Sequence, residues 1–147
     1  MTRDPEIVAF PNDYTFEIGQ TIIVREGSDV TIFSTGAQTV RCLQAADLLA
    51  RSGISAHVVH VPTIKPLDAE GIAEAAARTR RVVTAEDHTI IGGLGGAVAE
   101  ALGELQPTPM LRVGIRDTFG ESAANEDLLE KYGITPEHVA NAARALL

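Results

Sequence analysis

A chain of 147 residues, of which 45% are hydrophobic and 22% charged, is long enough to fold as one globular domain with its own core. It has no apolar run near the roughly 18 residues that a membrane span needs and no signal-peptide start, and its single cysteine excludes an internal disulfide, so we expect a cytoplasmic protein. The formal net charge of −8 disfavours a nucleic-acid partner, because such a protein presents a basic surface to displace counterions from phosphates.

The amino-terminal part of the sequence predicts an irregular arm followed by a strand–helix–strand unit. Proline, asparagine and aspartate interrupt every period in residues 1–17, which we interpret as a linker or extended arm ahead of a domain at 18–147. An edge strand is predicted at 21–25, and a second strand at 30–34, where β-branched and aromatic residues alternate. Apolar residues at helical spacing predict a helix at 37–51, and a β-rich run predicts a strand at 54–61.

The middle of the chain continues this alternation. Two prolines predict a loop at Thr63–Asp68, whose last residue is a suitable cap for an alanine-rich helix at 69–79. A strand at 81–85, a helix at 91–105 and a strand at 110–115 are predicted next.

Two shorter helices complete the predicted fold. Asn125 is expected to cap a helix that ends near Gly133, and Thr135-Pro136 opens the last helix, with proline at its tolerated first position. Alternating strands and helices with apolar strands indicate a largely parallel sheet covered on both faces. We therefore predict a three-layer α/β/α fold with a mostly parallel five-stranded sheet and one antiparallel edge strand.

Glu86, Asp87 and His88 follow a predicted strand, at the sheet edge where ligands or partner chains usually dock. Adjacent carboxylates favour the charged form of a histidine, a pairing that suits acid–base chemistry. The same residues could instead cap the next helix or contact a partner chain, and we favour this structural or interface role because no further catalytic group accompanies them.

The glycine-rich turn that follows does not match a dinucleotide-binding fingerprint. Counted from Gly93, the third glycine position of that fingerprint is occupied by Val98. We interpret the glycines as allowing a helix N-terminus to approach a neighbouring backbone closely, either in this sheet or in another subunit. The predicted partner or ligand edge comprises Glu86, Asp87, His88, Gly92, Gly93 and Gly95. Valine at positions 93 and 95 is then expected to abolish partner binding without unfolding the domain.

Other reactive residue types carry weaker signals. His57 and His60 are three apart on a predicted strand and therefore face opposite sides of the sheet, so they are not joint metal ligands. Ser122 lacks the strand and the closing glycine of a nucleophile elbow, and Cys42 is expected to be a buried thiol within a helix. We predict no catalytic residue and no metal ligand in the chain.

Four motifs together resemble the C-terminal domain of transketolases, and the resemblance runs from about Arg3 to Leu147. They are FEIGQTIIVREGSDVTIFSTG, TIKPLD, EDHTIIGGLGGAVAE and GIRDTFGESA, in that order. Deoxyxylulose-phosphate synthases and 2-oxoacid dehydrogenase beta subunits share weaker versions of these motifs. The resemblance implies an enzyme in which thiamine diphosphate and Mg²⁺ are held by two other domains, one binding the diphosphate and one the pyrimidine.

The resemblance also implies what this chain does within such an enzyme. The Gly-Asp-Gly…Asn magnesium motif and the pyrimidine domain's activating glutamate are absent from the sequence, so we expect no cofactor in the chain and no sugar turnover by it alone. The implied role is assembly with the transketolase N-terminal domains, in a homodimer. Arg3, in a segment similar to the linker that leaves the pyrimidine domain, is a candidate contact for the substrate's phosphate.

Two further alternatives remain open from the sequence. The position of Met1 near that linker indicates either a subunit encoded by a split gene or an excised domain. The second function to consider is an independent module that binds a small regulatory ligand at the sheet's carboxyl edge, at residues 34–36, Thr63 and 86–88.

Overall fold

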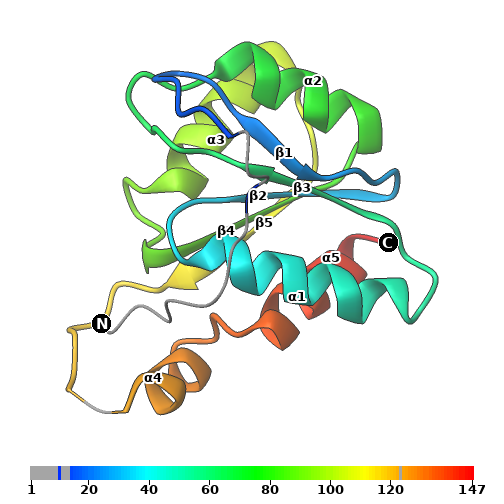
Figure 1. Cartoon of the computed structure of the whole chain (residues 1–147). Coiled ribbons are helices and arrows are strands. Elements are labelled where there is room, and N and C mark those ends of the chain that lie inside the picture. The colour runs from blue at the N-terminus through cyan, green and yellow to red at the C-terminus, as the bar shows by residue number, and fades with distance from the viewer. Residues whose placement is uncertain (1–9, 11–13, 123) are drawn as a thin grey trace.

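The computed structural model describes residue 10, residues 14–122 and residues 124–147 of the chain (Figure 1). Strands and helices alternate from the first βαβ unit onward, as the apolar periodicity predicted. In chain order the elements are β1 (Ile22–Arg25), β2 (Val30–Ser34), α1 (Gln38–Ala50), β3 (Ala56–His60), α2 (Ala69–Thr79), β4 (Val82–Thr89), α3 (Leu94–Leu105), β5 (Met110–Ile115), α4 (Asn125–Lys131) and α5 (Pro136–Leu146).

The five strands form one sheet in the order β1-β3-β2-β4-β5. Strands β2, β3, β4 and β5 run parallel, and β1 pairs with β3 in the antiparallel direction. The predicted fold class is therefore confirmed, including the antiparallel edge strand. Because the four parallel strands point the same way, the loops that follow them gather at one edge of the sheet, on the left of Figure 1.

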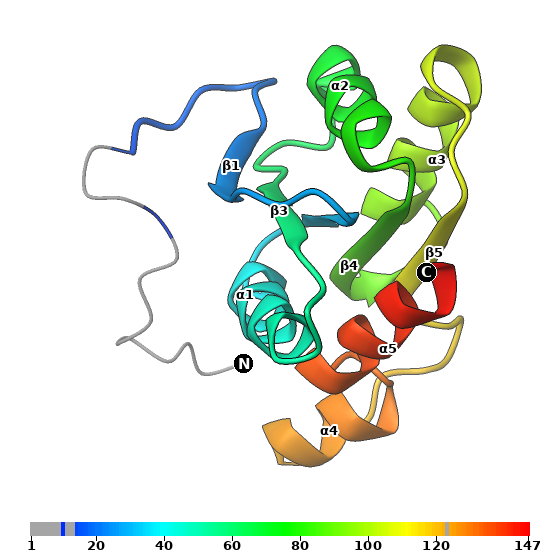
Figure 2. The same cartoon turned by 90° about the vertical axis from the view of Figure 1, so that its right-hand side faces the viewer.

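Helices cover both faces of the sheet, which gives the molecule two apolar cores. Helices α1 and α5 pack on one face and contribute to a cluster that includes Val58 and Val83, whereas α2 and α3 pack on the other face with Phe33 and Val59 (Figures 1 and 2). Neighbouring residues of β3 thus belong to different cores, because side chains alternate across a strand. No helix of the described part of the chain is both long and apolar enough to cross a bilayer.

Helix caps confirm two of the three predicted starts. The Asp68 side chain accepts a hydrogen bond from the Gly71 amide at the start of α2, and Thr135 caps α5 with Pro136 at the first helical position. At α4 the prediction is wrong, because Ala124 is the N-cap and makes no side-chain cap bond, while Asn125 lies inside the helix.

The predicted bounds are also wrong around β4. This strand continues to Thr89 instead of ending at Ala85, and α3 begins at Leu94 instead of Ile91. The pairing of β4 with β5 shifts register between Ala85 and Thr89, so that a polar segment remains in the strand through an irregularity.

The described part of the predicted arm contains no helix or strand between Tyr14 and Glu17. Phe10 stacks on the Tyr14 ring, with centroids 4.7 Å apart, and meets the His60 ring edge-on at 4.8 Å. The contact with His60 places Phe10 against the end of β3.

Candidate functional site

Glu86 is a buried residue of β4, and its side chain lies at the N-terminus of α3, where a helix can bind an anion. Its carboxylate oxygens accept hydrogen bonds from the amides of Leu94 and Gly95, at 2.9 and 2.8 Å. These amides belong to the first turn of α3, which has no partner for them within the helix. The favourable end of the helix dipole is therefore satisfied from within the chain, and this helix end is closed to an outside phosphate or carboxylate.

Glycines around this carboxylate allow α3, β4 and β5 to pack closely. A Cβ atom added at Gly93 would lie 1.9 Å from Glu86 Oε1 and 2.6 Å from the Thr89 carbonyl oxygen. At Gly95 it would meet Arg112 Cδ at 2.8 Å and Thr84 Oγ1 at 3.0 Å, and at Gly114, on the adjacent strand β5, it would meet Ile90 Cγ2 at 2.7 Å and Glu86 Cγ at 3.0 Å. The interpretation that glycines allow a close approach of helix and strand is supported for this sheet.

The six residues of the predicted partner edge are therefore divided by the structure. Glu86, Gly93 and Gly95 are buried and serve the internal contact, so they offer no surface to a partner. Valine at positions 93 and 95 would disturb the fold, and the expectation that these substitutions leave it intact is wrong.

The other three predicted edge residues lie nearer the surface. His88 and Gly92 are exposed, and Asp87 is half-buried with its Oδ1 atom close to Gly36. Gly92 has a φ of 73°, a conformation that favours glycine, and Ile91 beside it is 62% exposed. These residues remain a candidate contact surface. Within residues 14–122 and 124–147, the one hydrogen-bond partner of the His88 ring is the Thr89 carbonyl oxygen, at 3.4 Å, and no catalytic group adjoins it.

Ser34 and Thr63, two of the polar groups proposed for a regulatory ligand, already form hydrogen bonds within the chain. Ser34 donates a hydrogen bond to Thr39 Oγ1 at 2.9 Å, and Thr39 Oγ1 is bonded to His60 Nδ1 at 2.7 Å, so the buried ends of β2 and β3 are joined to the start of α1. Thr63 Oγ1 accepts from the Gly19 amide and donates to the Pro66 carbonyl oxygen. Burial lowers the pKa of His60 and so keeps the ring neutral. The alternative of a ligand-binding crevice thus has little unsatisfied polar chemistry to use.

His57 lies on the opposite face of the sheet, as the strand periodicity predicted. Its ring is buried against α2, with Nδ1 at 3.5 Å from Glu26 Oε2, and Arg78 pairs with the same oxygen at 2.7 Å. Burial lowers the pKa of His57, and Arg78 lowers it further against the opposing effect of Glu26. In the described part of the chain no three histidine, cysteine, aspartate or glutamate side chains gather as metal ligands.

Cys42 is buried as predicted. Burial raises the pKa of its thiol to about 12, so the reactive thiolate is scarce near neutral pH.

A hollow of about 220 Å³ lies at the opposite edge of the sheet, where the parallel strands begin. Its charged walls are already paired, since Arg25 binds Asp47 and Glu26 binds Arg78. The lining residues are Arg25, Glu26, Ala50, Gly53, Ile54, Ser55 and Ala56.

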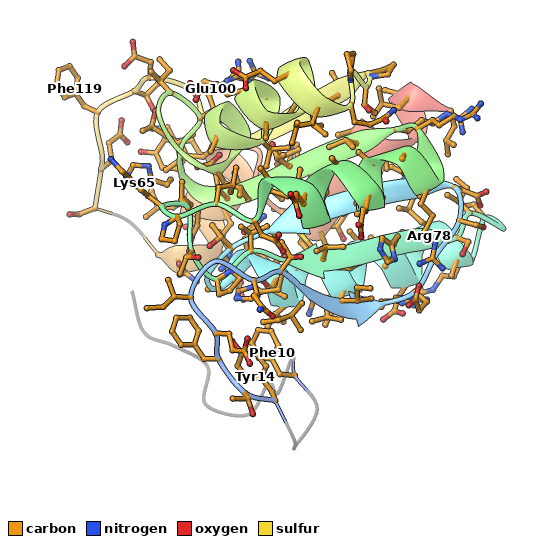
Figure 3. The ribbon with its side chains drawn as sticks, turned by 90° about the horizontal axis from the view of Figure 1, so that it is seen from above. Phe10, Tyr14, Lys65, Arg78, Glu100 and Phe119 are labelled. Carbon is orange, nitrogen blue, oxygen red and sulfur yellow. The ribbon has the colours of Figure 1, made fainter. Side chains whose placement is uncertain are left out.

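Phe119 is a feature of the carboxyl edge to which the sequence assigned no role. Its side chain is 96% exposed and, in Figure 3, is directed away from the ribbon. It lies in the loop between β5 and α4, within the GIRDTFGESA motif, and only the presence of an aromatic residue among polar loop residues could have signalled it. Arg3, the candidate phosphate contact, lies outside the described residues.

Comparisons with known proteins agree on one family. A family model described as the transketolase C-terminal domain matches residues 19–139. The chain is 44% identical over 143 residues to the 6-deoxy-6-sulfo-D-fructose transketolase subunit SqwH of Clostridium sp., covering 97% of this chain and 44% of that protein. It is 34% identical over 132 residues to one of the subunits of the apulose-4-phosphate transketolase of Phocaeicola vulgatus, covering 90% of this chain and 42% of that protein.

A solved structure gives the same result in three dimensions. The protein described as "Split gene transketolase, inactive beta4 tetramer" superposes with a TM-score of 0.92 at 46% identity, covering 96% of this chain and 46% of that one. The chain therefore spans less than half the length of these relatives.

Proposed function

The chain belongs to the transketolase C-terminal domain family, and from this premise we propose that it is the assembly domain of a transketolase-type enzyme. In the complete assembly the reaction is ketol-group transfer between sugar phosphates. The observation that carries the proposal is that the family model matches residues 19–139 and a transketolase subunit aligns with 97% of the chain, while the sequence motifs that bind the cofactor are absent from it. The resemblance of the four sequence motifs is thereby confirmed at the level of the family.

Transketolases depend on thiamine diphosphate, and the residues of this chain do not fit that cofactor. A diphosphate with Mg²⁺ needs oxygen ligands for the ion and free backbone amides for the phosphates. The described residues include no cluster of three potential metal ligands, and the amides at the start of α3 are bound to Glu86. We assign the cofactor and the chemistry to a partner polypeptide that carries the diphosphate- and pyrimidine-binding domains.

The proposed partnership includes self-association. Relatives of the chain are named as subunits of transketolases, and the structural relative is described as a tetramer. We propose that two copies of this domain lie in one cytoplasmic assembly, with each copy joined to the cofactor-binding domains. Arg3 is a candidate phosphate contact only within that assembly.

Co-purification with the partner tests the proposal. The chain is mixed with the polypeptide from the same genome that carries the two cofactor-binding domains, and the molar mass is measured by light scattering after gel filtration. Ketol transfer is followed with a coupled assay, for the chain alone, the partner alone and the mixture. We expect a stable complex, no turnover by the chain alone, and a gain in turnover on mixing. Lack of both a complex and a gain in turnover would refute the proposal.

A further inference from the structure

Phe119 is presented to solvent by a loop that is held at Phe119 and at Glu121 by contacts with the end of α4. The Tyr132 hydroxyl donates a hydrogen bond to the Phe119 carbonyl oxygen at 3.3 Å, and Lys131 forms an ion pair with Glu121. Before it, Asp117 has a φ of 34°, a left-handed conformation that turns the loop sharply. Because α4 holds the backbone around it, docking this side chain would cost less conformational entropy than ordering a free loop.

A second exposed apolar side chain lies on the neighbouring loop, which follows β4. Strands β4 and β5 pair at Thr89 and Ile115, and the Ile90 amide donates to the Ile115 carbonyl oxygen, so the two loops leave the sheet side by side. Ile91, which follows, is 62% exposed. Aromatic and other large apolar side chains exposed on adjoining loops are residue types enriched at the centre of protein–protein interfaces.

The charges around this anchor distinguish between possible partners. Segment 116–131 contains five acidic and two basic residues, and Lys131, one of the two basic residues, is already paired with Glu121. A two-fold contact between copies through this surface would bring acidic α4 close to its own counterpart, which like-charge repulsion opposes. A partner with a basic rim would be attracted. The acidic residues are Asp117, Glu121, Glu126, Asp127 and Glu130, and the basic ones are Arg116 and Lys131.

We propose that Phe119 anchors this domain in an apolar pocket rimmed by lysine and arginine on the polypeptide that carries the cofactor-binding domains. This inference rests on the proposed function and goes beyond it by naming the docking residue and the chemistry of the surface that receives it. Ile91 contacts the margin of the same pocket, and the exposed carboxylates of α4 pair with its basic rim.

Two pairs of variants of the full chain test the apolar and the charged part separately. Phe119→Ala removes the anchor, and Ile23→Ala is its control, because Ile23 is an exposed apolar residue on the other edge strand, β1. Glu130→Lys reverses one charge at the end of α4, and Glu104→Lys makes the same change at the exposed end of α3. Both lysines lie in the last turn of a helix, where a positive charge is tolerated.

The dissociation constant for the partner polypeptide is measured by biolayer interferometry at low and high salt, after circular dichroism has confirmed folding. We expect Phe119→Ala to weaken binding at least tenfold at both salt concentrations. Glu130→Lys should weaken it several-fold at low salt, with a smaller effect at high salt because ions screen the charges. Both controls should stay within twofold of the wild type.

The possible failures are distinguishable. Wild-type chain that neither binds nor activates the partner overturns both the proposed function and this inference. If the wild type binds and activates while Phe119→Ala binds equally well, only the anchor is refuted. Dissociation of a homo-oligomer by Phe119→Ala, with partner binding unchanged, would make a second copy the occupant and refute the basic partner surface. Unchanged or tighter binding of Glu130→Lys would refute the basic rim.

Discussion

Replacement of Glu86 by glutamine is expected to destabilise the domain far more than a surface substitution. The carboxylate accepts two backbone hydrogen bonds while buried, and glutamine can accept only one of them, with its NH₂ group facing the other amide donor. A hydrogen bond to a charged group contributes about 1.5–3 kcal/mol, and a buried unsatisfied donor adds its own penalty, so we expect a loss of about 2–4 kcal/mol. For a chain of this size that corresponds to a fall in Tm of roughly 6–13 °C.

Urea unfolding followed by far-ultraviolet circular dichroism gives the free energy of unfolding for Glu86→Gln. The matched control is Glu100→Gln, because Glu100 is an exposed glutamate of the same helix, labelled in Figure 3. The control should change the free energy by less than about 0.5 kcal/mol, as is usual for surface positions. Equal unfolding midpoints and slopes for the two variants would show that Glu86 does not hold the start of α3, and the argument for a closed helix end would fail.

Three further predictions concern the glycines and the titrating groups. Gly93→Ala should lower the free energy of unfolding by about 1–3 kcal/mol, because the added methyl group clashes with its neighbours. Gly96 lies in α3, and a methyl group added there would meet no atom within 4 Å, so Gly96→Ala should stabilise the domain by about 0.5–1 kcal/mol. Thermal unfolding that shifts both variants in the same direction would contradict this prediction. Burial lowers the folded-state pKa of His57 and His60, so the unfolded chain binds more protons; their contribution to stability is complete above the unfolded pKa of about 6.5 and is lost as the pH falls below it. The urea midpoint should therefore fall between about pH 7 and pH 5, and glutamine at both positions should flatten this dependence. At Asp68 burial raises the pKa of the carboxyl group, but the hydrogen bonds that it accepts lower this pKa more. Asp68→Asn should therefore lower the free energy of unfolding by about 1–2 kcal/mol at neutral pH, and by less as the pH falls below about 3.9. A loss of stability that is independent of pH would refute the role of the charge.

Hydrophobic periodicity was sufficient to predict most of the fold. The predicted bounds of β2, α2 and β5 agree with the structure, since each is an apolar or alanine-rich run between clear turn or cap residues. The end of β4 could not be predicted, because Glu86–Thr89 is polar and resembles a loop. The segment stays in the strand through pairing with β5, which is a contact between residues distant in the sequence.

The candidate site could be predicted only in part for the same reason. The sequence located the carboxyl edge at residues 86–95, but it could not show that Glu86 turns inward. That orientation depends on the register shift of β4 and on the space left by Gly114, which lies 28 residues further along the chain. The exposure of Phe119 likewise depends on its tethers to α4, which no local pattern reveals.

The fit between Glu86 and its glycines also restricts how this domain can diverge. A side chain added at 93 would overlap the Glu86 carboxylate, and one added at 114 would press on Ile90 and on the Glu86 Cγ atom. Losing the glutamate would in turn leave two helix amides without an acceptor. Single changes at these positions are therefore costly, and we expect the three to be replaced together or not at all. The neighbouring exposed loops can then change in evolution, and so adapt to a new partner, without a change in the contact between Glu86 and the start of α3.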